Sequence, residues 1–279
     1  MIIKIGLQFP GGTIGTDPAV IRDYAQEAEA LGYNHLVFNE HIVYLKPGSE
    51  GHSHQSHYHE LFGLLGFISG VTARIGLLTA VVVLPQRQAA VIAKQATEID
   101  VLGLGRLRLG VSIGTGIEEY QANGMSFADR GKRIEEQIAY MRALWTQDWV
   151  TFHGRWHQAE DIGLTFPPTQ RPIPLWMGGN ADPVLDRVGR IADGWLAPSL
   201  TDGVEKIEAV RAAAVAAGRD PDDVGIEGRV EIEGKTPDEW AAGLAAWEAL
   251  GATYVNVRGL RGGGVPIEVA RRFKEEVDL

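Results

Sequence analysis

Residues 74–116, RIGLLTAVVVLPQRQAAVIAKQATEIDVLGLGRLRLGVSIGTG, decide the fold of this 279-residue chain. The stretch holds two apolar runs typical of buried strands, the first followed by a helical pattern and the second by glycines. A β-α-β-loop unit of this kind buries its strands on both faces and leaves loops at their carboxyl ends, where α/β enzymes carry their chemistry. The stretch therefore predicts an α/β enzyme.

The same alternation of strand and helix continues on both sides of this stretch. An alternating pattern around Gly154 interrupts it and predicts a hairpin inserted before the fifth strand. Eight strands in alternation with helices predict a (β/α)8 TIM barrel formed by one domain, residues 1–279, and a doubly wound open sheet is the alternative. A closed barrel would pair the last strand with the first. Strands are predicted near residues 2–9, 35–39, 75–84, 107–113, 173–177, 194–197, 224–232 and 253–257, and helices near 18–31, 61–71, 89–102, 127–145, 183–191, 205–217, 237–250 and 266–276.

Composition narrows the classes of partner. The formal net charge of -10 argues against a nucleic-acid or anionic-membrane surface and favours a small-molecule substrate. The chain has no cysteine, so disulfides, thiolate catalysis and zinc-thiolate sites are excluded. The first residues, MIIKIGLQFPGG, lack the pattern of a signal peptide, and no apolar run approaches the length of a membrane span. We therefore expect a cytoplasmic protein.

The pair Glu40-His41 directly follows the second predicted strand, which places it at the carboxyl rim of a barrel. A histidine there can exchange a proton with a substrate near neutral pH, while Glu40 could orient the ring or bind a cofactor. The alternative is a loop pair that only meets solvent or caps the turn.

Two glycine-rich segments follow predicted strands. In Gly178-Gly179-Asn180-Ala181-Asp182-Pro183 the glycines allow close approach of a ligand, and the amides at the helix start favour an anion such as a phosphate. The alternative is that Asp182 caps its own helix. The segment 110–116, GVSIGTG, lacks the spacing of the dinucleotide fingerprint and the lysine of the P-loop, so it fits a flat ring better than a nucleotide.

Histidines and a tryptophan add weaker candidates. His52, His54, His57 and His59 cluster in a long polar loop, but the loop offers no scaffold that would hold imidazoles in place, so we predict no metal site. A metal-dependent barrel hydrolase is therefore a distant alternative. Trp195 follows Asp193-Gly194 in a predicted strand and could face a ring in the barrel mouth, with core packing as the alternative.

These motifs together resemble the bacterial luciferase-like family, and most closely its branch of deazaflavin (coenzyme F420)-dependent oxidoreductases. The likeness covers about residues 2–220 well and the last two strands weakly. The motifs stand in family order: residues 77–116, SFADRGKRIEEQIAYMRALWT (126–146), FHGRWH (152–157), PLWMGGN (174–180) and ADGWLAP (192–198).

The resemblance implies a cofactor cradle at the carboxyl ends of the strands. A non-proline cis peptide beneath the central ring falls on Ala80-Val81, backbone at Ile113 and Gly114 meets the polar edge of the ring, and residues 178–181 meet the phosphate. Glu118 is expected near the pyrimidine side. The cofactor implied is F420, with FMN as the alternative.

The resemblance also bears on the chemistry. Glu40 and His41 match an acidic-histidine pair that lies over the ring in deazaflavin-dependent sugar-phosphate dehydrogenases. Those enzymes carry a catalytic glutamate directly after the glycine that matches Gly114, whereas this chain has Thr115 there. We therefore predict hydride transfer between the cofactor and a small organic substrate, with His41 as the group that exchanges a proton and Glu40 in support, and leave the substrate open.

Two other functions and an assembly remain open. One function is an FMN-dependent monooxygenase that receives reduced flavin from a partner reductase, and the other is a flavin- or deazaflavin-binding protein without catalysis. The family resemblance and the weakly charged helix at residues 89–102 also predict a homodimer.

Overall fold

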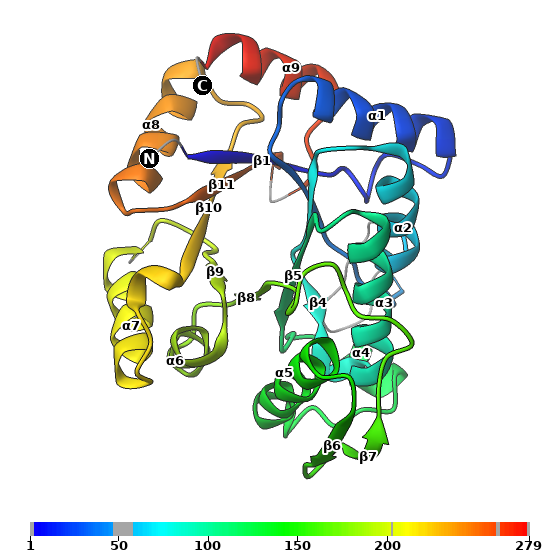
Figure 1. Cartoon of the computed structure of the whole chain (residues 1–279). Helices are drawn as coiled ribbons and strands as arrows, with labels where there is room; N and C mark the ends of the chain where they lie inside the picture. The colour runs from blue at the N-terminus through cyan, green and yellow to red at the C-terminus, as the bar shows by residue number, and fades with distance from the viewer. Residues whose placement is uncertain (1–2, 47–57, 202, 261–262, 278–279) are drawn as a thin grey trace.

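The computed structural model describes residues 3–46, 58–201, 203–260 and 263–277, and they form a barrel of parallel strands surrounded by helices (Figure 1). The strands follow the order β3-β2-β1-β11-β10-β9-β8-β5-β4, and a further pairing of β3 with β5 closes the ring. The closed ring confirms the TIM barrel and excludes the doubly wound open sheet. Its strands are β1 (Lys4–Gln8), β2 (His35–Phe38), β3 (Gly76–Thr79), β4 (Val82–Val83), β5 (Leu107–Ser112), β8 (Leu175–Gly178), β9 (Gly194–Leu196), β10 (Gly225–Glu231) and β11 (Tyr254–Arg258).

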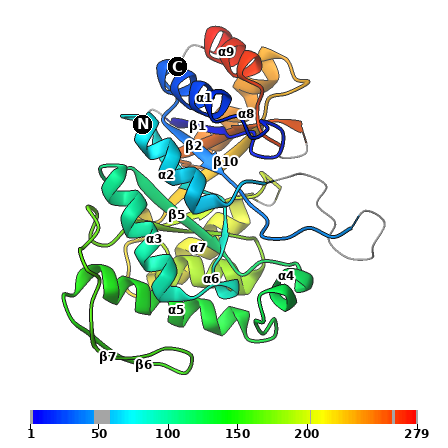
Figure 2. The same cartoon turned by 90° about the vertical axis from the view of Figure 1, so that its right-hand side faces the viewer.

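The first and last strands pair directly, as the sequence predicts. Lys4 lies opposite Tyr254 and Leu7 opposite Val257, in parallel register. Helices α1 and α9, which flank these strands in the chain, also lie side by side in both views (Figures 1 and 2). The barrel is therefore sealed between its two chain ends.

The helices match the predicted segments closely, with small differences at their ends. A short helix, α4, and two 3-10 turns were not predicted, because each is too short to show a periodic apolar stripe. The helix predicted from residue 127 begins at Arg130. The helical elements are α1 (Pro18–Ala30), α2 (Leu61–Val71), η1 (Leu84–Gln86), α3 (Ala89–Leu102), α4 (Ile117–Ala122), α5 (Arg130–Thr146), α6 (Asp182–Ile191), α7 (Gly203–Ala216), η2 (Pro221–Asp223), α8 (Pro237–Ala249) and α9 (Ile267–Glu276).

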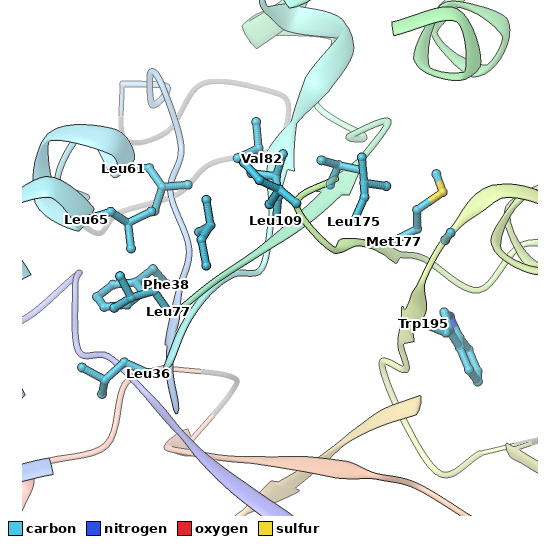
Figure 3. Packing of buried hydrophobic residues seen from close by; sticks show 14 of the residues in the cluster. Leu36, Phe38, Leu61, Leu65, Leu77, Val82, Leu109, Leu175, Met177 and Trp195 are labelled. Atoms are coloured by element: carbon cyan, nitrogen blue, oxygen red, sulfur yellow. The ribbon is translucent and has the colours of Figure 1, made fainter. Parts of the chain in front are cut away.

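The main core fills the layer between the barrel strands and the outer helices. Figure 3 shows Leu61 and Leu65 of α2 beside Phe38 and Leu77 of the strands, and all four side chains are buried. Full burial of a side chain of this size contributes about 1.5–3 kcal/mol, so this layer fixes the strands that carry the site.

One barrel position is interrupted between β3 and β4, where the peptide bond Ala80-Val81 is cis, as the family resemblance implies. The hydroxyl of Thr79 bridges this part of the wall, donating to the carbonyl of Gly110 at 2.7 Å and accepting from its amide at 2.8 Å. Glycine is required at residue 110, because a Cβ there would lie 1.9 Å from the Thr79 carbonyl oxygen.

A charged cluster lies near the amino ends of β2, β5 and β10. Glu227 of β10 bonds His35 through one oxygen and Arg108 through the other, each at 2.9 Å. Burial tends to raise the pKa of Glu227, but the neighbouring His35 and Arg108 outweigh it and hold the pKa below its ordinary value. Both oxygens of this carboxylate are therefore engaged beneath the site.

The predicted hairpin is present as β6 (Val150–His153) and β7 (Gln158–Ile162), an antiparallel pair inserted before β8 (Figure 2). The carboxylate of Glu136 on α5 holds its turn. It accepts the backbone amides of Arg155, Trp156 and His157 at 2.7–2.8 Å and the ring nitrogen of His157 at 2.8 Å. One carboxylate therefore binds the turn of the hairpin to α5 through four hydrogen bonds.

In the four described ranges, no helix has both the length and the apolar character of a membrane span.

Candidate functional site

A cavity of about 530 Å³ opens at the carboxyl ends of the barrel strands, within the size range of small-molecule sites. Residues from the segment that follows β2, the β3-β4 junction, β5, β8, β9 and β10 line it, so the fold alone brings them together. With the exception of Trp195, every site residue predicted from the sequence lines this cavity: Glu40, His41, Ala80, Val81, Ile113, Gly114, Glu118, Gly178, Gly179, Asn180 and Ala181.

One wall of the cavity is apolar and made of small side chains. Ala80, Val81 and Val83 form it at the β3-β4 junction, and Gly178 lies beside them. A Cβ at Gly178 would lie 3.2 Å from a methyl of Val81, and a Cβ at Gly114 would lie 2.6 Å from a methyl of Val83. Because both neighbours lack side chains, this wall can accept the face of a planar ring.

A second wall is made by the loop between β8 and α6. Ala181 is the N-cap residue of α6, and no side chain caps the helix, so Asp182 does not play the capping role considered above. Among the described residues, no protein acceptor bonds the amides of Asn180 and Ala181. Unpaired amides at the start of a ten-residue helix are donors that can bind an anion such as a phosphate.

Trp195 does not line the cavity, which corrects the expectation that it faces the ring. Its side chain is fully buried, and its Nε1 donates to the carbonyl of Gly179 at 2.7 Å. Gly179 has a φ of +126°, which favours glycine. Trp195 therefore holds the backbone of the loop between β8 and α6 from the barrel core.

The imidazole of His41 is bonded to a carboxylate that the sequence did not single out. Its Nδ1 lies 3.2 Å from Oε1 of Glu119, a buried residue of α4, and the amide of Gln86 donates to Oε2 of Glu119 at 3.4 Å. Burial tends to raise the pKa of Glu119, but these hydrogen bonds outweigh it and lower the pKa. An ionised Glu119 can therefore fix the orientation of the His41 ring.

Glu40 has a different set of partners. One oxygen pairs with the guanidinium of Arg87, and the other accepts the amide of Leu61 at 3.1 Å at the start of α2. Burial raises the pKa of this carboxyl against the opposing effect of Arg87. Of the two roles considered for Glu40, the structure gives ring orientation to Glu119.

Only one histidine of the histidine-rich loop lies among the described residues. His52, His54 and His57 lie outside the described residues. His59 donates from Nε2 to the carbonyl of Gly15 at 2.8 Å. No group of three potential metal ligands occurs in the part of the chain that the structure describes.

Two arginines, Arg130 and Arg229, also line the cavity, as does Thr115. The sequence did not single out either arginine: Arg130 lies within the stretch 126–146, which resembles the family without marking a ligand contact, and Arg229 lies in a strand with no recognisable motif. The cavity lining therefore carries cationic groups as well as the acidic residues Glu40, Glu118 and Glu119.

Comparison with known proteins points to one family. The model of the family described as luciferase-like monooxygenase matches residues 3–248. An uncharacterized protein of Mycobacterium tuberculosis is 36% identical over 182 residues, which are 62% of this chain and 62% of the relative. The chain therefore spans less than two thirds of the length of that relative.

Two further proteins are informative. The F420-dependent glucose-6-phosphate dehydrogenase of Segniliparus rotundus is 28% identical over 253 residues, 87% of this chain and 72% of the relative. Among solved structures, the coenzyme F420 dependent tetrahydromethanopterin reductase of Methanopyrus kandleri superposes with a TM-score of 0.79 at 15% identity, covering 99% and 98% of the two chains. Because only 15% of the residues are identical, the likeness to the reductase shows a shared fold alone.

Proposed function

Because this chain belongs to the luciferase-like monooxygenase family, we propose that it is an oxidoreductase that uses the deazaflavin coenzyme F420 and moves a hydride between the coenzyme and a small organic substrate. The observation that carries the proposal is one cavity that combines an apolar wall, an uncapped helix start and a bonded His-Glu pair. The name of the Segniliparus relative supports the choice of cofactor.

The residues of the cavity fit such a cofactor. The wall at Ala80, Val81 and Val83 would carry the face of the tricyclic ring, and the amides of Asn180 and Ala181 would bind the phosphate. The backbone at Ile113 and Gly114 would meet the polar edge of the ring. A bound deazaflavin supplies a ring carbon that accepts or releases a hydride.

His41 would move the proton that accompanies the hydride. In the oxidation of an alcohol, the imidazole would take the O–H proton, the bound coenzyme would supply the hydride acceptor, and a carbonyl compound would remain. Glu119 bonds Nδ1 and so orients the ring for this proton transfer. The reverse reaction returns the proton and the hydride to the carbonyl compound.

Thr115 bears on the substrate. It lines the cavity at the position where sugar-phosphate dehydrogenases of this type carry a glutamate, and a hydroxyl cannot serve as a carboxylate acid or base near neutral pH. The proposal therefore does not extend to sugar-phosphate oxidation.

Two alternatives share the same cavity. One is an FMN-dependent monooxygenase supplied with reduced flavin by a partner reductase, which would use the same apolar wall and the amides of Asn180 and Ala181. The description of the family as luciferase-like monooxygenase supports this alternative. A cofactor-binding protein without catalysis would keep the cradle but have no use for the His41-Glu119 pair.

Side-by-side titration of the purified protein with F420 and FMN tests the proposal. We expect preference for F420, and bleaching or recovery of its absorbance when a substrate is added. Preference for FMN with oxygen-dependent turnover would favour the monooxygenase. Tight binding without turnover across alcohols, aldehydes and ketones would favour the binding protein.

We also propose that the protein is a homodimer. Helix α3 packs against α2 and α5, yet Val91 and Leu102 on it remain about half exposed, and Leu104 just beyond it is 78% exposed. Exposed apolar side chains near one helix support an interface. Sedimentation at micromolar concentration should give a dimer, and a persistent monomer would contradict this assembly.

A further inference from the structure

Two arginines on neighbouring strands point into the barrel lumen. Arg229 on β10 lies opposite Asn256 on β11 and lines the cavity. Asn256 also faces the lumen, where its side chain donates to Gln8 of β1 at 2.9 Å. Because alternate residues of a strand share a face, Arg258 points into the lumen two residues further along β11.

Neither guanidinium is neutralised within the described part of the chain, where the structure has no hydrogen bond or ion pair from the side chain of Arg229 or Arg258. The Nε atom of Arg258 is buried without a partner. Glu227 is the carboxylate whose charge favours the protonated form of Arg229. Both of its oxygens are already bonded, to His35 and Arg108. By contrast, Arg87 beside the cavity is paired with Glu40.

Burial, followed by repulsion from Arg258, lowers the pKa of Arg229 to about 10. Arg229 therefore stays cationic at neutral pH, but its charge is held in a poorly solvated position without a counterion. Leaving a buried charge unpaired is costly, and an arginine meets the oxygens of a carboxylate or phosphate in a bidentate, charge-assisted contact. An anionic group of a ligand would supply that counterion.

The strand order places this charge across the cavity from the apolar wall. Passing from β3 through β2, β1 and β11 to β10 covers half of the ring of barrel positions. Arg229 therefore faces the junction that carries Ala80 and Val81. If the coenzyme ring lies on that junction, as the proposed function has it, the molecule that reaches Arg229 is the substrate.

We propose that Arg229, with Arg258 beside it, binds an oxyanion of the substrate, so that this enzyme acts on small alcohols or carbonyl compounds that also carry a carboxylate or a phosphate. This inference rests on the proposed function, because it assigns the opposite wall to the coenzyme. Carboxylate and phosphate share the recognition chemistry, and the test separates them.

The test is calorimetric titration of the free protein, and of the protein saturated with F420, with inorganic phosphate and with malonate at constant ionic strength. We expect the parent to bind at least one anion, and the stronger of the two identifies the group. Arg229→Met should weaken that binding by about 10- to 100-fold, and Arg229→Lys should weaken it less. Arg22→Met, on an exposed arginine of α1, is the matched charge control and should bind as the parent does.

Several results would overturn the inference. Equal anion binding by the parent and Arg229→Met, or no binding of either anion by the parent, would remove the subsite. Arg229→Met that loses F420 affinity while keeping anion affinity would assign the arginine to the coenzyme. If Arg229→Met does not fold, Arg229→Lys and Arg258→Met carry the same comparison. Failure of the parent to bind F420 would instead reject the proposed function, which the separate F420 titration reports.

Discussion

The indole of Trp195 is bonded to the carbonyl of Gly179 at 2.7 Å, so a fully buried residue of β9 holds the backbone of the loop that begins α6. Trp195→Phe keeps most of the buried volume but removes this donor. We expect a loss of about 1 kcal/mol in the free energy of unfolding, because one hydrogen bond to the half-buried carbonyl of Gly179 is lost, and a several-fold weaker affinity for the coenzyme.

Trp145→Phe is the control for that change. Trp145 is also fully buried, and its Nε1 donates to the carbonyl of Ala93, away from the cavity. It should lose comparable stability in denaturant titrations with unchanged coenzyme affinity. Equal coenzyme affinity in both variants would show that Trp195 only packs.

Gly179→Ala should weaken coenzyme binding more than it destabilises the barrel. Residue 179 has a φ of +126°, and a Cβ there would lie 3.0 Å from a methyl of Val184 in the first turn of α6. The loop must shift to relieve this contact, which displaces the amides of Asn180 and Ala181. Fluorescence titration of the coenzyme measures the affinity.

Gly218→Ala is the matched change for that experiment. Residue 218 has a φ of +74°, and a Cβ there would meet nothing within 4 Å. It should cost about 1 kcal/mol or more in stability from backbone strain and leave coenzyme affinity unchanged. An equal loss of affinity in both variants would contradict a role for the loop.

His41→Ala should slow the chemical step and spare the coenzyme. Loss of general acid-base assistance lowers turnover by about 100- to 10,000-fold, whereas the coenzyme is held mainly by the apolar wall and the loop amides. Single-turnover hydride transfer with bound coenzyme measures the step. His59→Ala, which removes a surface histidine bonded to Gly15, should react as the parent does. An unchanged rate in His41→Ala would remove this residue from the mechanism.

Glu119→Gln should lower turnover less than His41→Ala, by about 10- to 100-fold, because the ring remains but loses the ionised partner that orients it. Glu118→Gln separates orientation from binding, since Glu118 lines the same cavity one residue earlier. That variant should alter coenzyme affinity, if anything, and leave the single-turnover rate of the bound complex near that of the parent. If Glu118→Gln slowed hydride transfer more than Glu119→Gln does, Glu118 and not Glu119 would be the residue that supports His41.

The hairpin should loosen at acid pH through Glu136. Burial acts to raise the pKa of this carboxyl, but the bonds from His157 and the hairpin amides outweigh it and lower the pKa. A pKa lowered in the folded state means that the contribution is complete above the ordinary value of 4.5 and is lost as pH falls through the lower folded value. The protection factors of the amides in β6 and β7, measured by hydrogen exchange and corrected for the intrinsic exchange rate at each pH, should therefore fall between pH 7 and pH 3.

Glu136→Gln should show faster exchange in the hairpin already at neutral pH and a weaker dependence on pH. Glu160→Gln changes an exposed acid of the same hairpin, which pairs with His153 at 3.5 Å, and should follow the parent. Identical pH profiles in all three proteins would contradict the role of Glu136.

The sequence predicted the order of barrel strands and the outer helices, because long apolar runs and helical periodicity report them directly. It assigned Trp195 to the wrong side of its strand for a physical reason. Strands of a parallel barrel are buried on both faces, so Gly194, Trp195 and Leu196 carry no polar alternation that marks the lumen. Leu196, and not Trp195, lines the cavity.

The partners within the site were harder to predict than its positions. Glu119 meets His41 across 78 residues of chain, and it lies on a six-residue helix that leaves no periodic pattern. Arg229 and Arg258 read as charged residues within a strand, and only the register of β10 on β11 shows that both face the lumen. Such pairings depend on tertiary contacts that one sequence does not encode locally.

The pairing of β1 with β11 has a consequence for synthesis of the chain. Lys4 and Tyr254 are 250 residues apart, so the barrel cannot close until the segment through Arg258 has left the ribosome. Until then β1 and β10 are open sheet edges that can pair with other chains. A nascent chain that stalls before β11 should therefore bind chaperones. A truncated chain that ends before Tyr254 should aggregate after its release from the ribosome, although it contains most of the barrel strands.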